Sequence, residues 1–288
     1  MLVSTRSRRH VFAANLALAA LLFVVRPAHA QPARFHLVNT QTGAAAAPEL
    51  ADESTFVLGT AAMIAAAGRL PPAESRSVVP AMRAAYARLQ RDEGSVPSPW
   101  TSALPGPMLV IEPRQTSESH VGLVFLHGAG GNFAVQCSWL ARAGEAANAR
   151  TVCPSAGPDA RWTSPADRAE VGRGVAYLRA RGATQIYVDG LSNGAIGLSR
   201  LAPALARDVD GFVLISGAAT SARPTRRPTL IVQSRDDHMT PPRVARRYAR
   251  GAGPALHYVE LEGTHFMFAE RTDEVCRLIG DWLAALRS

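Results

Sequence analysis

The sequence contains no lysine, and all 31 of its basic residues are arginine. Because alanine is abundant as well, this absence is typical of a GC-rich genome and does not indicate an arginine-dependent function. Aromatic residues make up only 6% of the chain, and they are not interleaved with a stripe of basic residues. Without the four arginines of the first thirty residues, 27 basic residues face 23 acidic ones, so the formal charge falls from +8 to +4. A nucleic-acid partner is therefore not expected.

Cysteine is scarce, with 3 residues in 288, and the 8 histidines are scattered. These residues lack the spacing of metal ligands, so we predict neither a metal site nor a cofactor. Long hydrophobic runs are missing too, since the run Val11–Val25 is too short to span a bilayer comfortably. At 47% hydrophobic and 19% charged residues, the composition is that of a globular protein, and the length suits one α/β domain with an N-terminal addition.

Residues 1–30 resemble an export signal peptide. Three arginines between Arg6 and Arg9 precede the apolar run, and Ala28-His-Ala30 matches a cleavage site, so we expect a mature chain that begins at Gln31. The alternative is an uncleaved anchor. The twin-arginine and general secretory routes are equal alternatives, and no cysteine follows the run that could carry a lipid. We expect a periplasmic or secreted protein without a stable membrane anchor.

Residues 31–106 are expected to form an N-terminal arm and a helical extension. The alanine-rich, proline-containing stretch from 31 to about 50 is typical of a mobile arm. The patterns of Phe56–Ala67 and Val78–Leu89 predict two helices that precede the sheet. These helices could either pack on the domain or roof an active site, and the lack of catalytic residues in them favours packing.

Residues 107–288 show an alternation of strands and helices. Short β-branched, apolar runs are separated by segments with helical periodicity. This order predicts an α/β fold, with a mostly parallel β-sheet covered by helices on both faces. The expected strands are 108–111, 121–126, 150–153, 185–189, 211–216, 229–233 and 255–261, and the expected helices are 134–146, 165–181, 195–206, 241–251 and 272–286.

The sequence Gly190-Leu-Ser192-Asn-Gly194 lies at the junction of a predicted strand and a predicted helix. A Gly-x-Ser-x-Gly motif in this context is typical of a nucleophile elbow, in which a sharp turn exposes the serine hydroxyl to a base. Side chains at positions 190 and 194 would collide with the neighbouring strand and helix. We therefore predict that Ser192 is a catalytic nucleophile.

Two loops after later strands carry the residues that such a serine needs. Asp237 follows the next-to-last predicted strand, and His265 follows the last one. Loops at the carboxyl ends of parallel strands meet at one edge of the sheet, so these residues can meet Ser192. We predict His265 as the base and Asp237 as the acid that orients it. Asp236 is the alternative acid, and His238 is a weaker candidate for the base.

The glycine-rich run His127-Gly-Ala-Gly-Gly-Asn132 follows the predicted strand 121–126. Its glycines leave the backbone free to present an N–H group to a tetrahedral oxyanion. We predict an oxyanion hole formed by the backbone N–H groups of Ala129 and Asn193, with Gly130 as the alternative to Ala129. The His127 ring is expected to steady this loop and not to transfer a proton.

These motifs resemble those of the α/β-hydrolase family over roughly residues 107–288. Within that family, Leu126–Asn132 and Tyr187–Ala195 look like the secreted polyhydroxyalkanoate depolymerase-like and feruloyl-esterase-like proteins. The resemblance implies a serine esterase that hydrolyses carboxylic esters, either small molecules or polymers, through an acyl-enzyme on a Ser-Asp-His triad. A serine peptidase of the same fold and a non-catalytic binding protein on a hydrolase scaffold are the alternatives.

Three further expectations concern the surroundings of the site. The stretch between Ser216 and Thr229 is too short for a large lid. Export permits a disulfide, and we expect one between Cys137 and Cys153 that leaves Cys276 free, with three buried thiols as the alternative. Four large apolar residues could line a substrate pocket or belong to the core: Trp162, Phe266, Met267 and Phe268.

Overall fold

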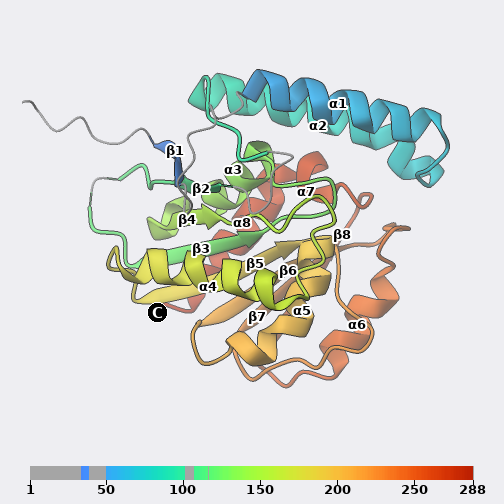
Figure 1. The fold of residues 1–288 in the computed structure, drawn as a ribbon. Coiled ribbons are helices and arrows are strands. Elements are labelled where there is room, and N and C mark those ends of the chain that lie inside the picture. The colour runs from blue at the N-terminus through green and yellow to red at the C-terminus, as the bar shows by residue number, and fades with distance from the viewer. Residues whose placement is uncertain (1–33, 39–49, 101–106, 116, 288) are drawn as a thin grey trace, which may run out of the picture. The chain divides into compact units, whose positions relative to one another are not determined.

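The computed structural model describes residues 34–38, 50–100, 107–115 and 117–287 (Figure 1). The expected export signal, its cleavage site and most of the expected arm lie outside these residues. The described residues from Arg34 onward belong to one compact unit. None of the helices within these ranges is long and apolar enough to cross a membrane.

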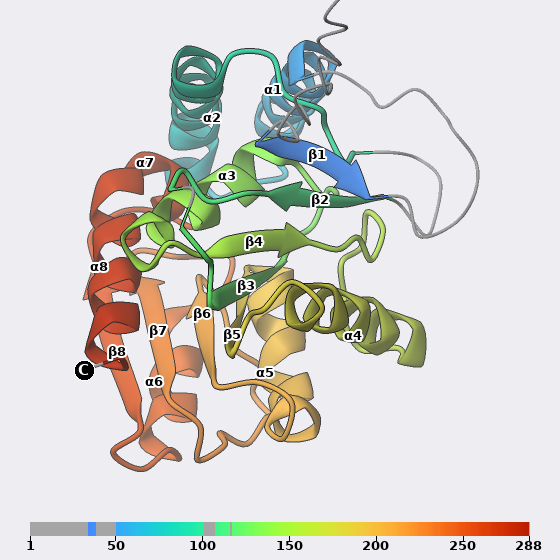
Figure 2. The same ribbon diagram turned by 90° about the vertical axis from the view of Figure 1, so that its left-hand side faces the viewer.

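An eight-stranded sheet forms the centre of the fold. Its strands are β1 (Phe35–Val38), β2 (Met108–Ile111), β3 (Val121–Leu126), β4 (Arg150–Cys153), β5 (Gln185–Leu191), β6 (Gly211–Ile215), β7 (Thr229–Ser234) and β8 (Leu256–Leu261). Their spatial order is β1-β2-β4-β3-β5-β6-β7-β8 (Figure 2). β2 runs antiparallel to both β1 and β4, and the strands from β4 to β8 in this order are parallel. The predicted mostly parallel sheet is confirmed.

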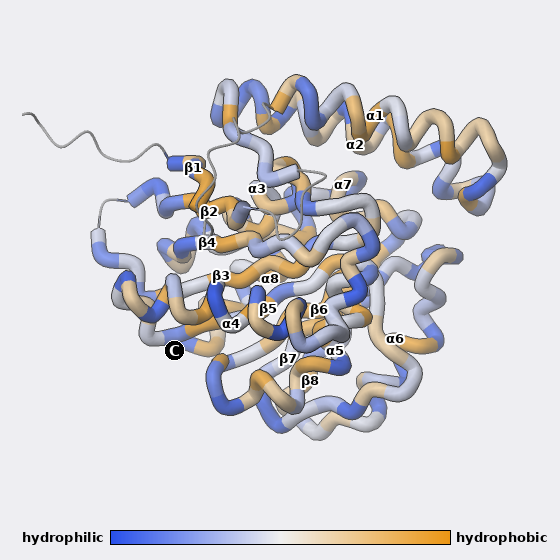
Figure 3. Tube along the Cα trace, in the orientation of Figure 1, coloured by the Kyte–Doolittle hydropathy of each residue, from blue (hydrophilic) through white to orange (hydrophobic). Residues whose placement is uncertain are grey.

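Helices cover both faces of the sheet. α3 (Ala134–Ala143) and α8 (Thr272–Ala285) pack on one face, while α4 (Pro165–Arg179), α5 (Asn193–Leu205) and α6 (Pro242–Arg250) pack on the other. Alternate residues along a strand enter the two hydrophobic cores, as Leu123 and Val124 of β3 show. Strands β3 and β6 carry no polar side chain, because both faces are buried (Figure 3).

The strands and helices predicted for residues 107–288 all occur, with small differences at their ends. The last turn expected for α3 is instead a short 3₁₀ helix, Glu145–Ala147, and the structure adds a short α7 (Met267–Glu270) that the patterns did not predict. No helix or strand lies between β6 and β7, a connection that the structure describes in full. The expected absence of a large lid there is confirmed.

Strand β1 corrects the expectation of a mobile arm for residues 35–38. It pairs antiparallel with β2, so that Phe35 lies opposite Ile111, and the Phe35 side chain is buried. Just before it, the Arg34 guanidinium lies 3.0 Å from the Glu145 carboxylate. A four-residue strand is too short to stand out in a stretch rich in alanine and proline, and it forms because β2 offers it an open edge.

The predicted helical pair consists of α1 (Leu50–Ala66) and α2 (Pro72–Glu93). The two helices lie side by side at the top of Figure 1, and α2 contacts both α3 and α7. Val78, Met82 and Leu89 of α2 enter the same hydrophobic core as α3 and α8. The pair is therefore an integral part of the described fold.

A disulfide joins Cys137, in the first turn of α3, to Cys153 at the end of β4, and the two Cα atoms lie 6.2 Å apart. Cys276 of α8 is a buried free thiol. The expected pairing is thus confirmed. The bond ties the beginning of α3 to the sheet.

Candidate active site

Ser192 is the single residue between β5 and α5. Its φ of 54° and ψ of −117° lie in a region that non-glycine residues rarely adopt, as the sharp turn requires. A Cβ at position 190 would lie 2.6 Å from the Gly194 backbone, and one at position 194 would overlap the Leu126 carbonyl. Glycine is therefore required at both positions, which explains the spacing of the motif.

Ser192, His265 and Asp237 form a continuous chain of hydrogen bonds. The Ser192 Oγ lies 2.8 Å from His265 Nε2, and His265 Nδ1 lies 2.9 Å from Asp237 Oδ2. The side chains come from the turn after β5, the loop after β8 and the loop after β7, so parallel strand ends bring distant residues together. His265 and Asp237 are 5% and 2% exposed. The arrangement can move a proton from the serine hydroxyl to the imidazole.

The Asp237 carboxylate is held by several donors besides His265. Its Oδ1 accepts hydrogen bonds from the Met239 and Thr240 N–H groups, at 2.9 and 2.7 Å, and its Oδ2 accepts one from the Gln233 amide at 2.9 Å. Burial opposes ionisation, but the hydrogen bonds from His265 and Thr240 outweigh it and hold the pKa of Asp237 below its ordinary value. An anion at this place favours the His265 tautomer whose bare Nε2 faces the serine.

The alternative residues Asp236 and His238 lie outside this chain of hydrogen bonds. Both side chains are exposed. The His238 Nδ1 lies 3.5 Å from Glu74 Oε1 of α2, and the His238 backbone N–H donates to the same oxygen at 2.9 Å. His238 therefore anchors the acid loop to α2, and it is His265 that reaches Ser192.

The glycine-rich loop passes directly against the turn that carries Ser192. A Cβ at Gly128 would lie 3.3 Å from the Ser192 Cβ. Gly130 and Gly131 have φ angles of 102° and 133°, which glycine adopts without strain. The Gly130 N–H donates to the Pro158 carbonyl at 2.8 Å, so this alternative oxyanion donor is already occupied.

Ala129 and Asn193 are the remaining candidates for an oxyanion hole. Ala129 borders the same pocket as Ser192 and His265. Asn193 is the first residue of α5, where N–H groups lack intrahelical partners and the helix dipole favours negative charge. Ala129 thus shares the pocket with the serine, and Asn193 follows it at a helix end that suits an anion.

His127 holds the glycine-rich loop in place. Its ring is fully buried, with Nδ1 2.9 Å from the Gly128 carbonyl, and its Nε2 accepts a hydrogen bond from the Ala156 N–H at 3.1 Å. Burial lowers the pKa of His127 to about 4, so the ring is neutral near pH 7. These contacts agree with the expected role of the ring in steadying the loop.

A pocket of about 300 Å³ opens beside Ser192 and His265. Its wall is mostly apolar, and α1 and α2 form one side of it. The helical pair therefore roofs the site, which corrects the expectation that it only packs on the domain. The lining residues from these two helices are Phe56, Val57, Thr60, Ala61, Ile64, Val78 and Met82.

Of the four apolar residues considered for the pocket, two line it. Phe266 and Phe268 border the cavity. Met267 and Trp162 are instead fully buried in the two hydrophobic cores. The Trp162 indole N–H donates to the His127 carbonyl at 3.0 Å, so this residue is bonded to the start of the glycine-rich loop.

The helical pair is also bound by polar contacts to each loop of the site. Glu53 of α1 accepts a hydrogen bond from the Val135 N–H, just after the glycine-rich loop, at 3.2 Å. Glu74 of α2 holds the acid loop, and the Ser77 hydroxyl lies 3.0 Å from that of Thr264, next to His265. Sequence reasoning missed all three residues. Within the described ranges, no cluster of side chains has the composition of a metal site.

Comparisons with known proteins support the fold. No family model matches the sequence, and no curated protein matches it. The structure is similar to that of XC6422 from Xanthomonas campestris, an α/β serine hydrolase without a lid, with a TM-score of 0.51 and 15% identity over 66% of this chain and 94% of that chain. It is also similar to a thermostable esterase, with a TM-score of 0.51 and 17% identity over 61% of this chain and 58% of that chain. The chain therefore has the α/β-hydrolase fold.

Proposed function

We propose that this protein is a serine esterase that cleaves carboxylic esters through an acyl-enzyme on Ser192. The observation that carries the proposal is the hydrogen-bonded chain from Ser192 Oγ through His265 to the Asp237 carboxylate, at 2.8 and 2.9 Å. In the first half-reaction, His265 takes the hydroxyl proton as Ser192 Oγ attacks the ester carbonyl. The Ala129 and Asn193 N–H groups stabilise the oxyanion. His265 then gives the proton to the leaving alcohol.

Deacylation repeats these steps with water as the nucleophile. His265 takes a proton from the water molecule, whose oxygen attacks the acyl carbon. The bond between the acyl group and Ser192 Oγ breaks as His265 returns the proton to that oxygen. Asp237 stays ionised throughout and stabilises the imidazolium in both halves of the reaction.

The pocket favours an ester with an apolar group of small to medium size. Its wall is predominantly apolar, and Ser192 and His265 border it. An ester panel that varies acyl length would identify the preferred group. The panel should include feruloyl esters and hydroxyalkanoate oligomers, because the motifs at Leu126–Asn132 and Tyr187–Ala195 resemble those of proteins that act on such esters.

The Ser192→Ala variant tests the proposed function. It should keep the circular dichroism spectrum of the wild type and lose nearly all ester turnover. A fluorophosphonate should add its mass to Ser192 of the wild type, as peptide mapping would show. Labelling of a different residue, or undiminished turnover by Ser192→Ala, would contradict the assignment. A wild type that binds esters without cleaving them would favour a binding protein on a hydrolase scaffold.

We further propose that the protein acts outside the cytoplasm, in the periplasm or the medium. The pattern of residues 1–30 supports this location. The disulfide between Cys137 and Cys153 supports it independently, because such bonds persist in oxidising compartments.

A further inference from the structure

Glu53 is a buried carboxylate that the proposed triad does not use. It lies on α1 with no exposed surface. Its Oε1 accepts hydrogen bonds from the Tyr86 hydroxyl at 2.9 Å and from the Val135 N–H at 3.2 Å. Its Oε2 accepts one from the Ala134 N–H at 2.9 Å and one from the Ser98 hydroxyl. These four donors compensate a polar group whose burial would otherwise be costly.

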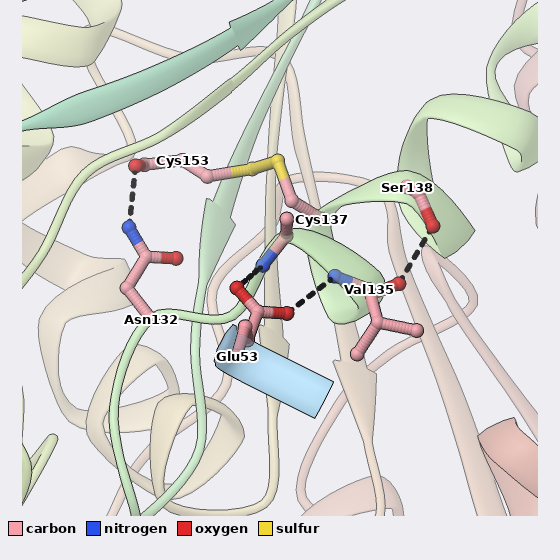
Figure 4. Close-up of a disulfide and its surroundings, with 7 residues drawn as sticks. Glu53, Asn132, Val135, Cys137, Ser138 and Cys153 are labelled. Carbon is pink, nitrogen blue, oxygen red and sulfur yellow. Dashed lines mark hydrogen bonds between the residues drawn. A yellow bond between two sulfur atoms is a disulfide. The ribbon is translucent and has the colours of Figure 1, made fainter. Parts of the chain in front are cut away.

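Two of the four donors are the first N–H groups of α3. The helix begins at Ala134, and its N-cap residue, Phe133, makes no side-chain capping bond. The first N–H groups of a helix lack intrahelical partners, and the helix dipole favours a negative charge beside them. Figure 4 shows Glu53 reaching this end of α3. Glu53 therefore caps α3 from 81 positions away in the chain.

The beginning of α3 is also the end of the glycine-rich loop, because only Phe133 separates Asn132 from the helix. On the side of the sheet, the Asn132 amide donates to the Cys153 carbonyl at 2.8 Å, and the disulfide ties Cys137 to Cys153 (Figure 4). On the side of the helical pair, Glu53 of α1 binds the first turn of α3. The loop thus ends at a helix that is fixed from two opposite sides.

We propose that Glu53 is a positioning residue for the oxyanion hole, which sets the place of the Ala129 N–H by holding the first turn of α3. The inference rests on the proposed esterase function. Glycines at positions 128, 130 and 131 give the loop little rigidity of its own, so external contacts must fix it. A displaced N–H group stabilises the oxyanion of the transition state less well, while binding of the ester changes less. The loss of stabilisation then appears as a lower kcat.

The Glu53→Gln variant tests this role at nearly constant size. The amide keeps one acceptor oxygen, but its NH₂ group faces a backbone N–H, so one bond to α3 is lost. We expect kcat to fall about 10- to 100-fold while KM changes less than about threefold. Affinity for a trifluoromethyl ketone, whose adduct with Ser192 carries an oxyanion, should weaken by a similar factor.

Tyr86→Phe is the matched control, because it removes one donor to Glu53 and leaves both bonds to α3. It should lower the melting temperature while kcat and the affinity for the ketone stay within about threefold of the wild type. The proposal is overturned if Glu53→Gln leaves kcat and ketone affinity unchanged. It is also overturned if Glu53→Gln and Tyr86→Phe both lose activity in proportion to the decrease in their melting temperatures.

A second variant covers the case in which Glu53→Gln does not fold. Glu53→Asp keeps the carboxyl group but is one methylene shorter, so it cannot reach α3 in the same way, and the same losses are expected. If neither variant folds, the role of Glu53 is structural alone and the proposal fails. A wild type without ester turnover or Ser192 labelling would instead refute the proposed function, which keeps the two failures distinct.

Discussion

Asp236 and Asp237 are adjacent in the chain, yet the strand-end turn gives them different surroundings. Asp237 is buried and accepts hydrogen bonds from His265, Met239, Thr240 and Gln233. The Asp236 side chain is exposed. In a triad, the acid keeps the imidazole in the tautomer that accepts the serine proton. Only Asp237 is placed to do so.

We predict that Asp237→Asn lowers kcat by about two to four orders of magnitude, whereas Asp236→Asn costs less than about tenfold. Steady-state kinetics on an aryl ester would measure both effects, after circular dichroism and melting curves have shown both variants to be folded. If Asp236→Asn is the impaired variant, the acid is assigned one residue too late. If neither variant is impaired, the acid comes from elsewhere.

Asp189, three residues before Ser192 on β5, makes the stability of the protein depend on pH. It is fully buried, and neither carboxyl oxygen has a hydrogen-bond partner among the described residues. Burial raises the pKa of Asp189 well above its ordinary value. The folded state therefore keeps a proton that the unfolded chain releases above about pH 4, so stability falls as the pH rises from there towards the folded pKa.

We predict that Asp189→Asn removes this slope. The stability advantage of the variant over the wild type should grow as the pH rises above about 4 towards the folded pKa, by at most about 1.4 kcal/mol per pH unit for one proton. Urea unfolding at several pH values would measure it. Asp208→Asn, which changes an exposed acid, is the control, and its free energy of unfolding should depend on pH as that of the wild type does. Parallel curves for Asp189→Asn as well would show that the carboxyl has an ordinary pKa.

The residues of the site differ in how far the sequence could predict them. Ser192, Asp237 and His265 each follow a strand, so the alternation of elements was enough to bring them together. Glu53 and Glu74 were not predicted, because their partners at the beginning of α3 and in the acid loop come near them only in the tertiary fold. A signal existed for Glu53, which lies at helical spacing with buried Leu50, Val57 and Ala61. An acid on such an apolar face needs buried donors.

Among the elements, α1 and α2 cover the candidate site. The connection between β6 and β7 is too short to do so. The apolar side chains of α1 and α2 form one wall of the pocket. The helices themselves were predictable from their periodicity, but their position was not, because it depends on contacts with loops far along the chain. Strand β1 was missed for a similar reason, since its partner β2 begins 70 residues later.

If the protein is the proposed esterase, we predict that Ala61→Phe, on the pocket side of α1, restricts it to shorter acyl groups. Ala61 is buried and lines the cavity, so a phenyl ring there would fill part of its volume. The ratio of kcat/KM for medium-chain over acetyl esters should fall about tenfold or more. Ala62→Phe, an exposed neighbour on the same helix, should leave the ratio unchanged. An unaltered ratio in Ala61→Phe would mean that the acyl group lies elsewhere.

At the scale of the whole molecule, the expected export signal and the disulfide favour the proposed location independently. The pattern of residues 1–30 predicts a mature chain that begins at Gln31, and a disulfide is favoured in an oxidising compartment. The free thiol of Cys276 is buried, so it should react with an alkylating agent only after unfolding.

We predict that protein recovered from the periplasm or the medium has the intact mass of a chain that begins at Gln31, less two hydrogens for one disulfide. Mass spectrometry before and after reduction would measure both features. Alkylation of the unfolded but unreduced protein should modify one cysteine. A mass that retains residues 1–30 would show that the segment is an uncleaved anchor.

The contacts that roof the pocket also bear on the order in which the protein is assembled. Val135, His238 and Thr264 follow their helical partners by 82, 164 and 187 residues, so the ribosome completes α1 and α2 long before the residues that hold them. Contacts between such distant positions form slowly. We expect enzyme activity during refolding to lag behind the circular dichroism signal of the sheet. Activity would then report that the chain has finished folding, and fragments ending before β8 would remain inactive.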